Sequence, residues 1–498
     1  MLKILFYIYL ICICLCVPSF VKAEDRLELV TKETSLGKID PGMIKESFVI
    51  SPNSKRIGYV AESNGKSCIV IDGAKKDYDG IGVGTIKFSN DGNHVAYAAE
   101  INGKWFVAAD GTESKRYDGI GSGTLRFSPD GKRLSYVAFQ GEKQLVVLDG
   151  FEGKYYDGIG TTPMFSSDSK HLAYVAMQDD KQFVVVDGAE GSGYDAIRST
   201  PFFSPDSGKL TYIASRGNNW LAIVNENESA EYDRVVLSPV FSPDSNRVAY
   251  PAIKDNKWFV VLDGIEGKRY DRIGTDLVFS PDSKRIAYSA MSDGKWLVNI
   301  EGSESKGYDS VTSVLFSPDS QRIAFMASQG SDQVVMLDGK GHGEYQGSGK
   351  GIIQFSPDSQ NLAYVILDDK GQFMVSDNKE GRHYNDINAS KIFSPDSKIA
   401  AYVAIKGSRC FIVVNDTEME SHSRIEDFAF SPDSRLIAYK AMDNNGWSLI
   451  ANGHQGNNYD SFLPGSSIIF DSPKKFHTLA IRNGEFLYVE VEVVPTKF

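Results

Sequence analysis

The chain has 498 residues, of which 42% are hydrophobic and 24% charged, and its formal net charge is −12. This length is too great for one ordinary hydrophobic core and predicts either two domains or an array of repeats. The acidic balance argues against nucleic acid and against an anionic membrane surface as partners.

The first 23 residues differ from the rest of the chain. After Lys3, the stretch 4–20 carries no charged residue, and the sequence Val-Lys-Ala at 21–23 is typical of signal-peptide cleavage. We therefore predict a signal peptide at 1–23 and export to the periplasm or the exterior. An uncleaved membrane anchor is the alternative, but the apolar run is short for a membrane span. Cleavage would remove two lysines and lower the net charge from −12 to −14, with no membrane insertion afterwards.

A repeated pattern, F-S-P-D-S-x-R-I-A-Y, organises the remainder of the chain. It recurs at intervals of 37 to 40 residues, and the last copy is the most degenerate. Its leading position is held by Ile50, Phe88, Phe127, Phe165, Phe203, Phe241, Phe279, Phe316, Phe355, Phe393, Phe430 and Phe470.

Each repeat unit predicts four short strands. The first strand ends at the leading Phe, and Ser-Pro-Asp-Ser or Ser-Pro-Asp-Gly then forms a tight turn. The second strand is exemplified by 285–290, and the third by 258–264, where Asp-Gly predicts a hairpin. The fourth carries Tyr-Asp, as at 270–271. Since the second and third strands are apolar on both faces, they must be sandwiched, and radial stacking predicts an all-β protein, a β-propeller of twelve four-stranded blades.

Bulky residues recur at two positions of the unit. Trp105, Trp220, Trp258, Trp296 and Trp447 all open the third strand. Cys410 has the same position and Cys68 lies within one residue of it, and these two cysteines do not make a disulfide scaffold. An aromatic binding ring or a redox pair is the alternative, but we interpret this position, like the tyrosine of the fourth strand, as packing between blades.

Two connections between units are candidates for binding. The glycine-rich segment 119–123 resembles a phosphate loop, yet it joins two strands instead of opening a helix, so we interpret it as a flexible connection between blades. Arg198, Arg234 and Arg272 lie in three successive connections after the fourth strand. We predict that these connections open onto one rim, where three cations can receive an acidic partner or ligand. Scattered surface arginines are the alternative.

The phase of the repeat predicts how the blades are divided. The array begins with a lone fourth strand at 37–40 and ends with a lone third strand at 485–493. A cut after Gly264 leaves two halves that each begin with a fourth strand and end with a third, so that each half can close without an open sheet edge. Propellers typically hold four to eight blades. We therefore predict two six-bladed propellers in tandem, at 24–264 and 265–498.

The core F-S-P-D-[SG]-K-R-[IL]-A-Y resembles the TolB-like, WD-related (PD-type) repeat of bacterial β-propellers. The resemblance covers all twelve units, from about Gly37 onward, and implies a propeller fold. Proteins with such repeats include periplasmic scaffolds that bind other envelope proteins and the propeller halves of prolyl peptidases. This sequence departs from TolB itself, because it has twelve units instead of six and no room for an N-terminal α/β domain before the first blade.

No pattern in the sequence predicts chemistry. The chain has no G-x-S-x-G elbow, no H-E-x-x-H, H-x-H or C-x-x-C spacing and no D-x-D-x-D-G calcium loop. The histidines are scattered, and acidic pairs such as Asp179-Asp180 lie in polar hairpin loops. We therefore expect no catalytic residue, no metal ligand and no cofactor.

Two functions remain open, and the central channel distinguishes them. The first is a non-enzymatic scaffold that binds a protein or other ligand through its rim loops, and the second is a propeller enzyme or glycan-binding protein that uses the channel. A channel site needs acids or histidines on the first strands. The residues just before the leading Phe favour the scaffold, since they include neither: Lys87, Arg126, Met164, Phe202, Val240, Val278, Leu315, Gln354, Ile392, Ala429 and Ile469.

Overall fold

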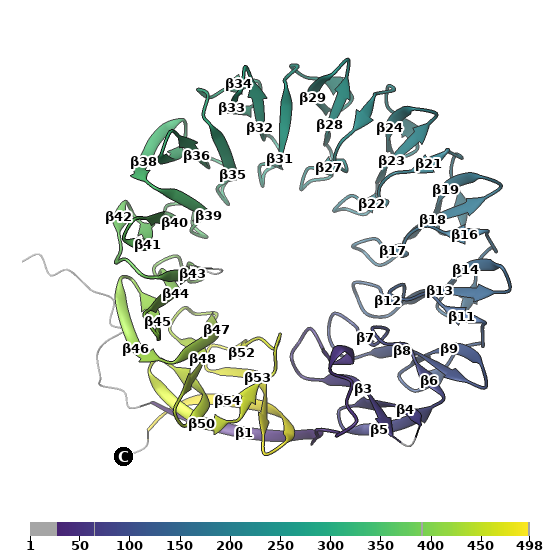
Figure 1. The fold of residues 1–498 in the computed structure, drawn as a ribbon, viewed down its shortest axis with the longest axis horizontal. Coiled ribbons are helices and arrows are strands. Elements are labelled where there is room, and N and C mark those ends of the chain that lie inside the picture. The colour runs from purple at the N-terminus through teal and green to yellow at the C-terminus, as the bar shows by residue number, and fades with distance from the viewer. Residues whose placement is uncertain (1–26, 64, 390–391, 497–498) are drawn as a thin grey trace, which may run out of the picture.

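The computed structural model describes residues 27–63, 65–389 and 392–496. These residues form twelve antiparallel β-sheets arranged as the blades of one ring (Figure 1), so the protein is an all-β β-propeller of twelve blades. Besides the strands, the described residues contain the short 3-10 helix η1 (Lys45–Ser47). No helix among them is both long enough and apolar enough to span a membrane. The predicted signal peptide, 1–23, lies outside the described residues.

Two long central strands form a hairpin in the middle of every blade. From blade 1 to blade 12 these pairs are β3 Ile57–Ser63 and β4 Lys66–Ile71; β8 Val95–Ile101 and β9 Lys104–Ala109; β13 Leu134–Gln140 and β14 Lys143–Leu148; β18 Leu172–Gln178 and β19 Lys181–Val186; β23 Leu210–Arg216 and β24 Asn219–Val224; β28 Val248–Lys254 and β29 Lys257–Leu262; β32 Ile286–Ser292 and β33 Lys295–Ile300; β36 Ile323–Gln329 and β37 Asp332–Leu337; β40 Leu362–Asp368 and β41 Gly371–Ser376; β44 Ala401–Lys406 and β45 Arg409–Val414; β48 Ile437–Asp443 and β49 Gly446–Ala451; β53 Lys475–Arg482 and β54 Glu485–Pro495.

Shorter strands flank each hairpin on its inner and outer sides. The inner strands, often split in two, are β2 Val49–Ile50, β6 Gly80–Ile81, β7 Lys87–Phe88, β11 Gly119–Ile120, β12 Arg126–Phe127, β16 Gly158–Ile159, β17 Met164–Phe165, β21 Ala196–Ile197, β22 Phe202–Phe203, β26 Arg234–Val235, β27 Val240–Phe241, β31 Arg272–Phe279, β35 Ser310–Phe316, β39 Ser348–Phe355, β43 Asp386–Asn388, β47 Arg424–Phe430, β51 Ser461–Phe462 and β52 Ile469–Ser472. The outer strands are β5 Ala74–Tyr78, β10 Thr112–Glu113, β15 Phe151–Glu152, β20 Ala189–Glu190, β25 Asn227–Glu228, β30 Ile265–Glu266, β34 Ser303–Glu304, β38 Lys340–Gln346, β42 Lys379–Glu380, β46 Thr417–His422, β50 His454–Tyr459 and β1 Leu27–Lys38. The glycine-rich segment 119–123 thus begins with a paired inner strand, β11, and is not wholly a free connection.

Blade 6 shows why the repeat forms these strands. Asp263 and Gly264 adopt φ of 53° and 83°, the backbone that a tight turn between β29 and β30 requires. The Asp263 carboxylate accepts hydrogen bonds from the Val248 N–H at 2.9 Å and from Arg247 Nε at 3.0 Å, which joins this turn to the start of β28. Beyond β30, an isolated bridge pairs Tyr270 with Trp258. The Tyr-Asp signature therefore lies just after the short outer strand.

The hydrophobic core is divided among the spaces between neighbouring blades. Trp220 of blade 5 packs against a cluster that includes Tyr250 and Phe259 of blade 6, and Trp258 packs against residues of blade 7. The prediction that the tryptophan position packs between blades is confirmed for these two residues. Cys68 and Cys410 are buried, free thiols.

A hydrogen bond between neighbouring turns joins successive blades. The last Ser of each Ser-Pro-Asp-Ser turn, and of Ser-Ser-Asp-Ser at 166–169, accepts a hydrogen bond through its Oγ from the backbone N–H of the Asp in the preceding blade, at 2.8–3.0 Å. We call this contact the Ser–Asp latch. It joins Asp130 to Ser169, Asp168 to Ser207, Asp206 to Ser245, Asp244 to Ser283, Asp282 to Ser320, Asp319 to Ser359, Asp358 to Ser397 and Asp396 to Ser434.

We expect Ser283→Ala to lower the free energy of unfolding by about 1–2 kcal/mol, because the Asp244 N–H then loses its acceptor, the hydroxyl of the buried Ser283. Urea denaturation of the whole chain measures this change. Lys284→Ala, at the exposed neighbouring residue, is the control and should change the free energy of unfolding little. Equal stability of the two variants would show that the latch does not hold blades together.

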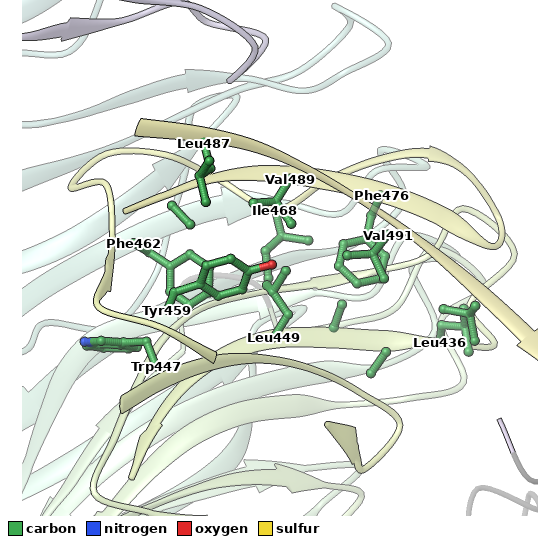
Figure 2. Packing of buried hydrophobic residues seen from close by; sticks show 14 residues of the cluster. Leu436, Trp447, Leu449, Tyr459, Phe462, Ile468, Phe476, Leu487, Val489 and Val491 are labelled. Carbon is green, nitrogen blue, oxygen red and sulfur yellow. The ribbon is translucent and has the colours of Figure 1, made fainter. Parts of the chain in front are cut away.

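The two ends of the described chain meet in blade 12, where they close the ring. The N-terminal strand β1 pairs antiparallel with β54 from Leu27↔Pro495 to Lys38↔Glu485, so a lone fourth strand completes a blade that lacks one. The prediction that an N-terminal strand completes a blade is confirmed, but the strand is Leu27–Lys38 instead of 37–40, and its partner is β54 instead of the third strand that ends at Gly264. Glu33 of β1 forms an ion pair with Arg482 and accepts a hydrogen bond from the Tyr459 hydroxyl at 3.0 Å. Figure 2 shows the core beside this joint, where Tyr459, Phe462 and Leu487 lie together.

The prediction of two six-bladed propellers, 24–264 and 265–498, is wrong, because all twelve blades share one ring (Figure 1). The predicted boundary after Gly264 falls inside the β29–β30 hairpin, where Leu262 pairs with Ile265. The interface between blades 6 and 7 resembles its neighbours: the Arg247 guanidinium lies 5.9 Å from the centre of the Phe279 ring and donates to the Lys284 carbonyl at 3.0 Å. The packing between blades thus continues across the predicted boundary, so neither half closes on itself.

Candidate functional site

The predicted rim is formed by two kinds of loop that an aspartate holds together. In blade 5, Asp195 in the incoming connection accepts a hydrogen bond from the N–H of Gly217, in the hairpin between β23 and β24, at 2.6 Å. Asp233 and Asp271 make the same contact in blades 6 and 7, to backbone N–H groups at 2.8 and 3.0 Å. The connections that carry the predicted arginines therefore lie beside the hairpins of the second and third strands.

Two of the three predicted arginines meet at one tryptophan. The guanidinium carbon of Arg198 lies 5.6 Å from the centre of the Trp220 ring, and that of Arg234 lies 5.4 Å from it. Arg198 follows β21 of blade 5, whereas Arg234 begins β26 of blade 6, so the contact spans two blades. Cation–π attraction orients both side chains. We call this group the Arg–Trp–Arg stack.

The positive charge of the stack is not neutralised by a nearby acid. In residues 27–63, 65–389 and 392–496, no carboxylate lies within 4.0 Å of a guanidinium nitrogen of Arg198, Arg234 or Arg272. Arg198 donates through Nε to Ser215 Oγ at 3.2 Å. All three arginines are exposed. The stack can therefore receive an anionic group without first breaking an ion pair.

Arg272 is not brought into the stack. It begins β31 of blade 7 and pairs with Met291 in the sheet. It occupies the position in blade 7 that Arg234 occupies in blade 6, so the same rim continues to it.

The inner strands of the same two blades expose apolar side chains. Phe202 of β22 is 44% exposed and Val240 of β27 is 38% exposed. The Phe202 ring stacks on Phe241 of the next blade, with 6.3 Å between ring centres. The sequence pattern showed that these positions carry no carboxylate, but their exposure required the structure. Blades 5 and 6 thus present both unpaired cations and exposed apolar groups.

Two buried histidines have carboxylate partners. His422 Nδ1 lies 2.6 Å from Asp443 Oδ2, and His477 Nδ1 lies 2.6 Å from Asp471 Oδ2. Nε2 of His477 also lies 2.8 Å from the Asn53 carbonyl oxygen of blade 1. Both rings are nearly inaccessible to solvent, so they link segments of the fold. No group of three His, Cys, Asp or Glu side chains in the described part of the chain is arranged to hold a metal ion.

Comparisons with known proteins give only weak likenesses. No family model matches the chain, and no curated protein matches it. A crystal structure of a eukaryotic initiation factor aligns with a TM-score of 0.34 at 15% identity, covering 66% of this chain and 92% of that one.

Two further solved structures align with this chain. TolB from Acinetobacter baumannii aligns with a TM-score of 0.24 at 18% identity over 44% of this chain and 65% of its own. The β-propeller domain of the Trilobed protease from Pyrococcus furiosus aligns with a TM-score of 0.25 at 13% identity, over 52% and 96%.

Proposed function

We propose that the protein is an exported, non-enzymatic scaffold, built from TolB-like, WD-related repeats, that binds an acidic protein or other acidic ligand at its rim. The binding site is the Arg–Trp–Arg stack of blades 5 and 6, and Arg272 extends it. Export rests on the sequence at 1–23, and a place in the periplasm or outside the cell follows from it. The proposal involves no catalytic step, cofactor, metal ion or nucleic acid.

The unpaired charge of the stack carries this proposal. On the same rim, exposed lysines are paired with aspartates: Lys181 with Asp195 at 2.6 Å, and Lys257 with Asp271 at 2.6 Å. Arg198 and Arg234 instead stack on Trp220, although the protein as a whole is acidic. A positively charged group on the surface of an acidic protein attracts acidic partners and orients them during encounter.

A fluorescent decaglutamate peptide tests the site by anisotropy. We expect the wild-type chain to bind it with an affinity that falls as the salt concentration rises, and the double variant Arg198→Ala, Arg234→Ala to bind at least tenfold more weakly. Arg126→Ala is the matched control, because Arg126 is exposed on the inner strand β12 of blade 3, away from the stack.

The control also separates the scaffold from a channel-binding protein. Loss of binding in Arg126→Ala, with binding retained in the double variant, would assign the ligand to the inner strands and contradict the rim site. Crosslinking in an envelope extract then identifies the natural partner, which should be captured by the wild-type chain and not by the double variant.

A further inference from the structure

A carboxylate joins neighbouring blades at the outer strands of most interfaces. The Glu of one outer strand forms an ion pair with a Lys or Arg of the previous blade, accepts a hydrogen bond from the Tyr of that blade, or does both. Between blades 6 and 7, Glu304 lies 2.8 Å from Lys268 Nζ and accepts from the Tyr270 hydroxyl at 2.6 Å. Between blades 9 and 10, Glu418 lies 3.4 Å from Arg382 and accepts from the Tyr384 hydroxyl at 3.0 Å.

The interface between blades 7 and 8 lacks this carboxylate. Gly341 occupies the position in β38 that Glu304 occupies in β34. Lys306 Nζ, the counterpart of Lys268, donates instead to Gln329 Oε1 at 3.1 Å. The Tyr308 side chain is completely buried, and its hydroxyl has no hydrogen-bond partner.

A second substitution removes the other partner of Tyr308. At several interfaces the tyrosine also approaches a tyrosine in the second strand of the next blade, as Tyr78 approaches Tyr97, with 3.0 Å between the hydroxyl oxygens. Blade 8 has Phe325 at that position, and its ring meets Tyr308 edge-on at 5.8 Å. The Tyr156 hydroxyl also lacks a partner at hydrogen-bond distance, but it lies near the Glu190 carboxylate and helps to lower the pKa of that group. For Tyr308, burial alone raises the pKa.

A cavity of about 760 Å³ lies where the glutamate is missing. Lys306, Tyr308, Gln329, Met336 and Gly341 are among the residues that line it. Cavities at the neighbouring interfaces 5–6 and 6–7 have volumes of about 400 and 300 Å³. A Cβ atom added at Gly341 would meet no atom within 4 Å, so this glycine leaves space that a side chain fills in other blades.

We propose that this cavity binds the carboxylate of a ligand, which takes the place of the missing glutamate between Lys306 and Tyr308. The ligand's carboxylate forms an ion pair with Lys306 Nζ and, when the side chains that cover the Tyr308 hydroxyl move aside, accepts a hydrogen bond from it. A buried donor without an acceptor is costly, and a charged acceptor satisfies it best. The volume admits a molecule considerably larger than the glutamate side chain.

Lys306 is the cation among the residues that line the cavity, and Glu304 and Glu344 line it as well. Glu304 lines the cavity, but Lys268 and Tyr270 of blade 6 hold its carboxylate. Glu344 is exposed to solvent, where water screens its charge. Burial lowers the pKa of His342, which favours its neutral form, and its Nε2 also lacks a hydrogen-bond partner. Lys306 is therefore the cation that an incoming carboxylate meets.

Gly341→Glu in the full chain tests the site, with glutarate as the small-molecule probe and acetyl-Gly-Glu-Gly-amide as the peptide probe. We expect isothermal titration calorimetry to detect binding of at least one probe to the wild-type chain. Gly341→Glu should weaken binding at least tenfold and raise the Tm, because the new side chain occupies the site. Gly341→Ala keeps the cavity and should bind as the wild type does. The probe that binds more tightly shows whether the carboxylate comes from a small molecule or from a polypeptide.

Two further variants keep the test independent of Gly341. Lys306→Met leaves the cavity open and should still weaken binding at least tenfold. Glu190→Gly recreates the vacant site between blades 3 and 4, beside Lys154 and Tyr156, and should gain a second binding site. Arg198→Ala with Arg234→Ala should leave binding unchanged, so this site and the rim site can fail separately. Absence of binding by both probes, or binding that survives Gly341→Glu, would overturn the proposal.

Discussion

A chain that begins at residue 39 is expected to form oligomers, whereas a chain that begins at residue 27 should form a monomeric closed ring. The shorter chain lacks β1, which pairs with β54 over ten register positions. Its loss uncovers the edge of β54, and an unpaired edge recruits strands from other chains. Leu27 and Leu29, which pack on the core of blades 11 and 12, are lost as well.

The expected loss of stability is on the order of 5 kcal/mol or more, since two leucines and a partly buried ion pair disappear together. Burial by itself would raise the pKa of Glu33, but hydrogen bonds from Asn457, Arg482 and Tyr459 outweigh it and lower this pKa. The contribution of Glu33 is therefore present at neutral pH and is lost as the pH falls below the ordinary value of 4.5.

Size-exclusion chromatography with light scattering measures the oligomeric state of the truncated chain. Thermal unfolding measures its loss of stability. A synthetic peptide with the sequence 27–38 serves as the control, because it should add to the free edge of β54 and restore the monomer. A monomeric 39–498 chain with unchanged Tm would show that β1 is not the element that closes the ring.

A rise in stability between pH 7 and pH 9, absent in Lys440→Met, is the second expected result. Lys440 of β48 is only 2% exposed and donates hydrogen bonds to the carbonyl and the Oγ of Ser466 in blade 12. Burial lowers its pKa to about 8, against the attraction of Asp427 and Glu426. The equivalent residue of blade 10 is Val403, so the charge replaces an apolar side chain at the interface between two blades.

The direction in which the free energy of unfolding changes with pH follows from the number of protons that each state binds. The unfolded chain holds the lysine proton up to a pH of about 10.4, whereas the folded chain releases it near pH 8. Between these values the unfolded state binds more protons, so the free energy of unfolding increases with pH. The increase amounts to about 1 kcal/mol from pH 7 to pH 9 and to about 3 kcal/mol over the whole interval.

Urea denaturation of the wild type and Lys440→Met at pH 7 and pH 9 measures this difference. Measurements stop at pH 9 because tyrosines ionise in the unfolded chain above it. Lys406→Met, at an exposed lysine of blade 10, is the control and should keep the wild-type rise. A wild-type chain whose stability is the same at both pH values would contradict the assignment of Lys440 as a buried, easily deprotonated lysine.

The sequence alone determined the structure of the blade. Turn residues such as Asp263 and Gly264 act within a few residues, and the apolar central strands are continuous in sequence, so both leave a clear repeated pattern. The phase of that pattern also indicated that an N-terminal strand completes a blade, but it placed this strand at 37–40 and its partner at 258–264, whereas the structure pairs β1 with β54. In the candidate site, the sequence placed Arg198 and Arg234 on one rim.

Only the tertiary structure decided the number of blades in the ring and the contacts of the sites. The angle between two blades depends on how groups such as Arg247 and Phe279 fill the space between sheets. Because these angles add up around the ring, a small change in each alters the number of blades that closes it. The stacking of two arginines on Trp220, and the vacancy that Gly341 leaves beside Tyr308, likewise depend on residues from different blades. A repeated local pattern determines each blade, whereas distances between blades arise from side-chain packing across many separate residues.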